Sequence, residues 1–218
     1  MSEEIEELYE QARKGTLPLS FNDWQRADRY GVTVAHEAAR YGHLPPNFNH
    51  WDWRDGWGDT VAHVAACYGH LPDDFSKWDM RNYDSLTVAH MAARYGHLPP
   101  GFDRWELADE GGYTVAHMAA RYGHLPPDFD RWELATINRW TVAHEAAEYG
   151  HLPVGFSQLD LANKSGWTVE EEVAYQLLQQ LEAKKPTPAP KPKPQDDFDA
   201  YWDSPAALGN QSGPDLEL

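Results

Sequence analysis

Histidine supplies the most conspicuous chemistry in this sequence. Ten of the 11 histidines fall into two series, and the members of each series are 27 residues apart. Imidazole nitrogen is a common zinc ligand, and nitrogens that share one zinc ion lie about 3–4 Å apart. The first series is His36, His63, His90, His117 and His144. The second series is His43, His70, His97, His124 and His151.

The spacing of the two histidine series does not favour a metal centre. His36 and His43 are seven residues apart, which is about 10 Å along a helix. Equivalent residues of packed neighbouring helices are about 8–10 Å apart. We therefore expect structural, hydrogen-bonding histidines, with no metal ion and no other cofactor. If they are buried and neutral, their pKa falls below the usual value and acid destabilises the fold.

Other candidate catalytic groups are weak. Cys67 is the only cysteine, and it occupies a variable position that Arg40, Arg94, Arg121 and Glu148 fill elsewhere, which indicates an incidental thiol. The sequence has no glycine-rich phosphate loop and no serine-nucleophile motif. We expect a protein that is not an enzyme.

The histidines belong to a segment that returns along the chain. Residues 33–45 begin Thr-Val-Ala-His-x-Ala-Ala and end Gly-His-Leu-Pro, and nearly the same segment recurs with a period of 27 residues. The threonines that open the copies are Thr33, Thr60, Thr87, Thr114, Thr141 and, in a decayed copy, Thr168. A fixed period of this size predicts a stacked repeat array.

Each repeat is predicted to contain two helices and a polar loop. Thr33 is a good N-cap for a helix over residues 34–41, and Gly42 suits the left-handed turn that ends it. Leu44-Pro45 is expected to open a second helix of one to two turns, with Phe48 and Trp51 on one face. These Leu, Phe and Trp residues recur as columns, which stacking would join into one core.

The ends of the chain differ from the internal repeats. We expect residues 1–32 to form an N-terminal capping repeat, with a helix from Glu3 to Lys14 and Tyr9 in the place of the first histidine. Residues 33–167 form five repeats, and residues 168–185 form a C-terminal capping helix. The cap is expected to turn its polar residues outward, namely Glu170, Glu172, Gln179, Gln180 and Glu182. Residues 186–195 read as a Pro/Lys-rich linker and residues 196–218 as a disordered acidic tail.

The repeat resembles the ankyrin repeat, which carries Thr-Pro-Leu-His-x-Ala-Ala and then Gly-His. The likeness covers about residues 6–185 and implies an all-α, ankyrin-like helical repeat solenoid. It also implies that the Thr33 and His36 series brace turns, and that the protein binds other proteins. The sequence departs from the ankyrin pattern in its Val-Ala for Pro-Leu, its Leu-Pro-x-x-Phe-x-x-Trp segment and its 27-residue period, where ankyrin has about 33.

Charge narrows the choice of partner. The chain has 18 Lys+Arg against 35 Asp+Glu, a net charge of −17, which disfavours direct nucleic-acid binding and anionic membranes. A basic or nucleic-acid-binding protein is the favoured partner. The acidic N-terminal stretch does not look like a signal peptide, and a single cysteine fits a reducing compartment. We expect a cytoplasmic protein.

Variable large residues mark the predicted partner surface. In the loops and helices of a constant frame, varied side chains are how repeat proteins build binding faces. Varied large residues lie a few positions before the capping threonines, among them Tyr30 and Ile137. The predicted partner-binding residues are Trp57, Tyr83, Met91, Tyr113, Met118, Trp140 and Trp167, with Phe198, Tyr201 and Trp202 in the tail.

Two functions are compatible with these features. The first is a non-catalytic scaffold, acting as an inhibitor or adaptor, that engages a protein through its repeats and tail. The alternative is an acidic nucleic-acid mimic that blocks a DNA- or RNA-binding enzyme, as an anti-defence protein would. Its acidic stripe would be Asp52, Asp73, Asp74, Asp79, Asp103, Glu106, Asp128, Asp130 and Glu133.

Overall fold

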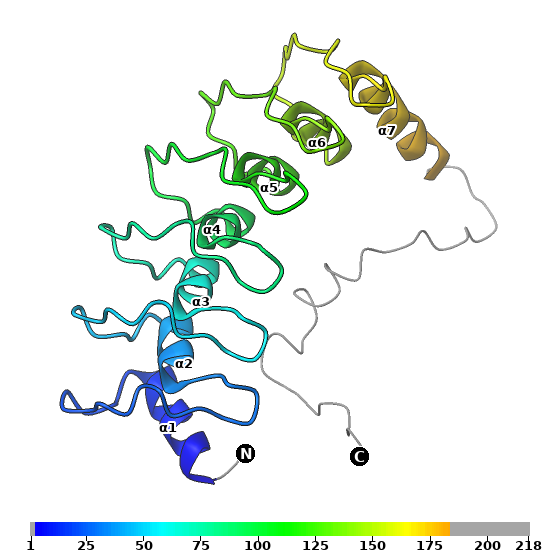
Figure 1. Ribbon diagram of the computed structural model, residues 1–218. Helices are drawn as coiled ribbons and strands as arrows, with labels where there is room; N and C mark the ends of the chain where they lie inside the picture. The colour runs from blue at the N-terminus through cyan, green and yellow to red at the C-terminus, as the bar shows by residue number, and fades with distance from the viewer. Residues whose placement is uncertain (1–2, 184–218) are drawn as a thin grey trace. The chain divides into compact units, whose positions relative to one another are not determined.

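The computed structural model describes residues 3–183, and within that range it has seven helices and no strands. From α1 to α6, each helix packs against the next one in the chain (Figure 1). The 27-residue period is therefore a helical repeat, as predicted. The helices are α1 (Glu3–Lys14), α2 (Val34–Arg40), α3 (Val61–Tyr68), α4 (Val88–Tyr95), α5 (Val115–Tyr122), α6 (Val142–Glu148) and α7 (Val169–Ala183).

The short repeat helices begin sharply because their first N–H groups all have acceptors. In α3 the Thr60 hydroxyl accepts from the His63 N–H at 3.3 Å, and the Thr60 N–H donates to His63 Nδ1 at 3.2 Å. Histidine thus takes the part that Glu or Gln plays in a capping box. The N–H groups of Val61 and Ala62 donate to the carbonyls of two tryptophans earlier in the chain. The helix has only eight residues, so such capping offsets an otherwise unfavourable nucleus.

The predicted second helix of each repeat is wrong. After Leu44-Pro45 the chain makes a turn, in which the Phe48 N–H donates to the Pro45 carbonyl at 2.9 Å, and then runs without helix to the next loop. The carbonyls of Trp51 and Trp53 accept from the first two N–H groups of α3, at 3.1 and 3.0 Å. A helix would direct these carbonyls along its own axis, so the segment caps the next helix instead of forming one.

The aromatic columns form one continuous core, as predicted. Phe48 packs edge-to-face on Trp51 at 5.3 Å between ring centroids, and Trp51 packs on Phe75 of the next repeat at 5.7 Å. The same alternation runs from Phe21 to Phe156. Edge-to-face pairs add a specific attraction to area burial, and every second pair in this series joins two neighbouring repeats and helps to fix their register.

Both histidine series tie neighbouring repeats together. His36 Nε2 donates to the Asp59 carbonyl, 23 residues ahead, at 3.2 Å. His43 Nδ1 donates to the Ala12 carbonyl at the end of the preceding helix, at 3.0 Å. Each later copy repeats these bonds. The predicted hydrogen-bonding role of the histidines is confirmed.

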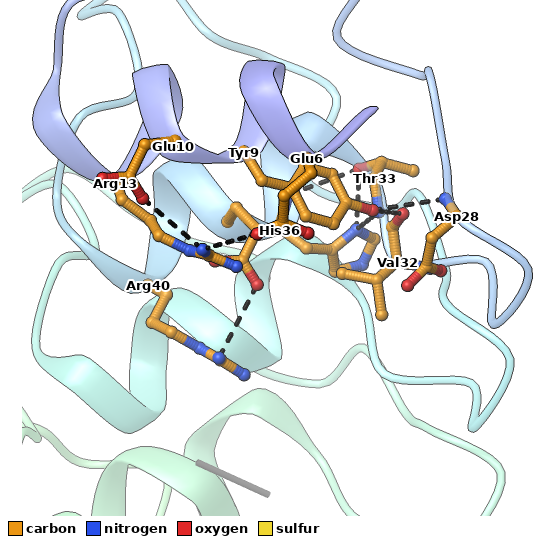
Figure 2. Close-up of polar contacts among 10 residues, drawn as sticks. Glu6, Tyr9, Glu10, Arg13, Asp28, Val32, Thr33, His36 and Arg40 are labelled. Carbon is orange, nitrogen blue, oxygen red and sulfur yellow. Dashed lines mark hydrogen bonds and ion pairs between the residues drawn. The ribbon is translucent and has the colours of Figure 1, made fainter. Parts of the chain in front are cut away.

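Tyr9 replaces the first histidine in function as well as in position. Its hydroxyl donates to the Val32 carbonyl, the atom equivalent to the Asp59 carbonyl of the next repeat, and accepts from the Asp28 N–H at 3.2 Å. Figure 2 shows these contacts beside the Thr33–His36 pair. Burial is the main reason that the pKa of Tyr9 is raised, so the hydroxyl stays a donor.

The last helix departs from the predicted polar cap. A regular capping box opens α7, since the Thr168 N–H donates to Glu171 Oε2 at 2.8 Å and the Glu171 N–H to Thr168 Oγ1 at 3.2 Å. Glu172, however, is buried and accepts from Trp167 Nε1 at 2.9 Å. It packs inward because its position matches Glu37 and Glu145, which are also buried. Leucines further along α7 are exposed instead.

One loop position should respond to glycine. Arg139 has φ 59°, in the left-handed region, where the equivalent residue of most other loops is glycine. Arg139→Gly removes a backbone strain of about 1 kcal/mol. Part of this gain is offset because glycine has a greater conformational entropy in the unfolded chain. We expect a small rise in the free energy of unfolding in urea. Gly166 has φ 82°, and no atom lies within 4 Å of the place that a Cβ would take. Gly166→Ala is therefore the opposite substitution at the equivalent position, and it should lower the free energy of unfolding.

Candidate functional site

Six short loops precede the capping residues and present the variable side chains. We name them the tip loops: residues 28–32, 55–59, 82–86, 109–113, 136–140 and 163–167. In the second, Asp55 Oδ1 accepts from the N–H groups of Trp57 and Asp59 at 2.9 and 3.0 Å, and a bridge joins Arg54 to Thr60. Asx turns of this kind hold the loop without help from a partner. The frame of the site is therefore preorganised.

Neighbouring tip loops are also bonded to each other. The Gly56 N–H donates to the Tyr30 carbonyl at 2.7 Å, and the Ile137 N–H to the Gly111 carbonyl at 3.1 Å. Arg54 Nη1 donates to the Arg81 carbonyl at 2.6 Å, and Arg81 Nη2 to the Ala108 carbonyl at 2.6 Å. The two arginines thus join the residues that directly precede the second, third and fourth loops. Their guanidinium groups help to fix the surface rather than serving only as exposed charges.

Three aromatic residues on consecutive loops form a row, which we name the tip aromatics: the half-buried Tyr30 and the exposed Trp57 and Tyr83. Tyr30 and Trp57 stack at 5.9 Å between centroids with 22° between their planes. The Tyr83 ring lies on Gly58, where a built Cβ would come within 2.3 Å of Tyr83 Cγ, and the Arg54 guanidinium lies 5.8 Å from the ring centroid. Trp57 is 40% exposed and Tyr83 69% exposed. These rings are held in place while much of their area faces solvent.

Three other predicted site residues form an inner layer. The Tyr113 hydroxyl donates to Glu145 Oε1 at 2.8 Å, and Trp140 Nε1 donates to Glu145 Oε2 at 2.7 Å. Burial raises the pKa of Glu145 to about 6. Trp167 repeats the arrangement with Glu172 and stays 37% exposed. Tyr113 and Trp140 are half-buried, so only part of each ring is open to a partner.

The two methionines are not part of an accessible surface. Met91 is 0% exposed and Met118 is 4% exposed. They follow the first-series histidines, and this helix position points into the stack in every repeat except α3, where Val64 is half-buried. The prediction that they contact a partner is therefore corrected. Phe198, Tyr201 and Trp202 lie outside the described residues.

The acidic residues of the alternative hypothesis are all exposed. They belong to the segments that follow the Leu-Pro turns. Two of them pair across repeats, since Arg104 Nη2 lies 3.6 Å from Asp79 Oδ2 and Arg131 Nη1 lies 2.8 Å from Glu106 Oε2. Exposed pairs of this kind contribute little stability. Most of these carboxylates therefore remain available to a basic partner.

Hydrogen bonds and burial determine the state of the first-series histidines and of Cys67. In the first series, Nδ1 accepts from a threonine N–H and Nε2 donates to a carbonyl, so both nitrogens are engaged. Within residues 3–183, no group of three or more His, Cys, Asp or Glu side chains could hold a metal ion. Desolvation raises the pKa of the Cys67 thiol, which is the opposite of the shift that activates a nucleophilic cysteine.

Asp59 is a buried carboxylic acid that the sequence did not reveal. It is 4% exposed, and Asn82 Nδ2 donates to its Oδ1 at 2.9 Å. Burial raises the pKa of Asp59 to about 7. The equivalent residues in other repeats are Val32, Leu86, Tyr113, Trp140 and Trp167. That apolar series was the available signal that this position faces inward.

Comparisons with known proteins give no assignment. No protein-family model matches the chain, and no curated protein matches it. Among residues 3–183, no helix has the length and apolar character needed to cross a membrane.

Proposed function

We propose that this protein is a non-catalytic, ankyrin-like binding scaffold whose tip loops engage another protein. The observation that carries the proposal is the row of tip aromatics on three consecutive loops, in which Trp57 and Tyr83 are exposed while each ring packs on a neighbouring group. Tyrosine, tryptophan and arginine dominate binding hot spots. A frame fixed before binding reduces the entropy that association loses.

The proposed solenoid includes caps at both ends. Exposed glutamates on α1 and the capping box of α7 support this reading, since terminal repeats need a solvated outer face. The tail residues Phe198, Tyr201 and Trp202 remain a predicted second contact. We propose an inhibitor or adaptor that works in the cytoplasm on a basic or nucleic-acid-binding protein, because the net charge is −17.

The test begins with affinity capture from the native host, followed by binding measurements on the full chain. Trp57→Ala with Tyr83→Ala is expected to weaken binding of the captured partner by roughly 1,000-fold, since hot-spot truncations cost about 2 kcal/mol or more each. Leu19→Ala with Tyr41→Ala is the matched control, because both side chains are exposed but lie outside the tip loops. Equal binding by the two double variants would refute a tip-loop interface.

The alternative function is a nucleic-acid mimic, and the exposure of all nine carboxylates in the Leu-Pro segments favours it. Asp73→Asn with Asp74→Asn would then weaken binding, and competitor DNA would displace the partner. Under the leading proposal, binding is lost in the tip-aromatic variant and competitor DNA leaves the complex intact. The two proposals therefore give opposite results with the same purified partner.

A further inference from the structure

Arginine side chains accompany the tip aromatics. Arg29 lies in the first tip loop, Arg54 and Arg81 directly precede the second and third, and all three are exposed. The Arg29 guanidinium lies 4.7 Å from the ring centroid of Tyr30, and the Arg54 guanidinium lies 5.8 Å from that of Tyr83. Stacking uses the face of a guanidinium, so its charge and the N–H groups on its edge remain for other partners.

The carboxylates of the same loops are mostly turned inward. Asp28 Oδ1 and Asp55 Oδ1 each accept from two backbone N–H groups of their own loop, at 2.9 to 3.1 Å. Asp59 is buried and accepts from Asn82 Nδ2. Within the first three tip loops, Asp84 is the one exposed carboxylate. The loops therefore use their acidic groups to hold their own backbone and present their basic groups to solvent.

The three arginines are fixed by carbonyls and rings rather than by carboxylates. Arg54 Nη1 donates to the Gly58 carbonyl at 2.7 Å, and Arg81 Nη1 donates to the Ser85 carbonyl at 2.6 Å. Among residues 3–183, no carboxylate forms an ion pair with any of the three. A carbonyl positions a guanidinium but does not neutralise its charge. The surface at the tip aromatics is therefore cationic, although the chain has a net charge of −17.

We propose that the tip loops recognise an acidic segment of the partner, whose carboxylates meet the three arginines while an apolar side chain covers the tip aromatics. This inference rests on the proposed tip-loop interface and names the chemistry of its partner. Arginine binds carboxylates with two parallel N–H bonds, and complementary charge in a contact gives specificity. A partner that is basic overall meets this requirement when it presents such a segment, because the net charge acts at long range and the arginines act in the contact.

The test measures binding of the full chain to two sets of synthetic peptides of equal length and aromatic content, one acidic and one neutral. We expect the wild type to bind the acidic set more tightly. Arg29→Glu should weaken that binding roughly 10-fold or more, because it places like charges together. Lys77→Glu makes the same charge change at an exposed residue of a Leu-Pro segment and should leave binding unchanged. No preference for the acidic set, or equal losses in the two variants, overturns the proposal.

The captured partner separates this inference from the proposed function. Arg29→Glu should weaken its binding too, and circular dichroism should show that the variant remains folded. If Trp57→Ala with Tyr83→Ala weakens binding of the partner and Arg29→Glu does not, the tip-loop interface stands and the acidic segment is wrong. If neither variant weakens binding, the tip-loop interface itself is refuted.

Discussion

Replacing His63 by leucine is expected to lower the free energy of unfolding by about 2–4 kcal/mol. The substitution keeps the apolar volume but leaves the buried Thr60 N–H without the Nδ1 acceptor that it contacts at 3.2 Å. It also removes the Nε2–H donor to the Leu86 carbonyl at 3.1 Å. An unsatisfied buried donor costs about 1–3 kcal/mol, and a lost hydrogen bond about 1 kcal/mol more. Urea unfolding measures the difference.

His70→Leu is the matched control for this substitution. His70 belongs to the second series and makes one bond, from Nδ1 to the Ala39 carbonyl at 2.9 Å, in a more exposed position. The Ala39 carbonyl also accepts from the Gly42 N–H and keeps a partner in the variant. The expected loss in the free energy of unfolding is therefore about 1 kcal/mol. Equal losses for the two variants would show that the first series does not have the bracing role inferred from the geometry.

Acid is expected to weaken the fold by a net amount of about 3 kcal/mol between pH 7.5 and 5. Burial lowers the pKa of four first-series histidines, His36, His63, His90 and His117, from 6.5 to about 4. As the pH falls below 6.5, the unfolded chain binds protons before the folded chain does, so stability is lost until about pH 4. Each histidine contributes about 2 kcal/mol of this loss at pH 5.

Three buried acids oppose the histidines. Burial raises the pKa of Asp59 to about 7 and those of Asp55 and Glu145 to about 6. As the pH falls, these groups bind protons in the folded chain before they do so in the unfolded chain. Together they therefore raise the free energy of unfolding by about 5 kcal/mol between pH 7.5 and 5. Asp59→Asn removes half of that gain and should make the acid loss about twofold larger. Urea unfolding at both pH values tests this, and a stability that does not change in either protein contradicts it.

The local features of the chain were predictable because they depend on neighbours in sequence. The α1 bounds, Glu3–Lys14, agree with the prediction from periodicity and a terminal glycine. The threonine caps were predicted because a hydroxyl reaches the N–H three residues ahead. Even the substitution of Tyr9 for histidine was visible, because the repeat aligns it with His36.

The second helix was predicted wrongly for a physical reason. Phe48 and Trp51 are three residues apart, a spacing that a helix and an edge-to-face aromatic pair satisfy equally well. The structure chooses the pair, because the carbonyls of Trp51 and Trp53 bond to α3. These carbonyls accept hydrogen bonds from residues about ten positions ahead. Local helix propensity does not account for contacts at that separation.

Some features of the candidate site were also predictable from the sequence, and others were not. By itself the sequence determined an all-helical repeat, its period, its caps and the aromatic character of the loop tips, because periodicity and capping are local. Only the tertiary structure decided that Trp57 and Tyr83 are exposed while Met91 is buried, and that Glu145 binds Tyr113 of the preceding repeat. These outcomes depend on contacts between residues about one repeat apart. Their geometry is set by how the repeats stack, and a spacing of 27 residues does not specify it.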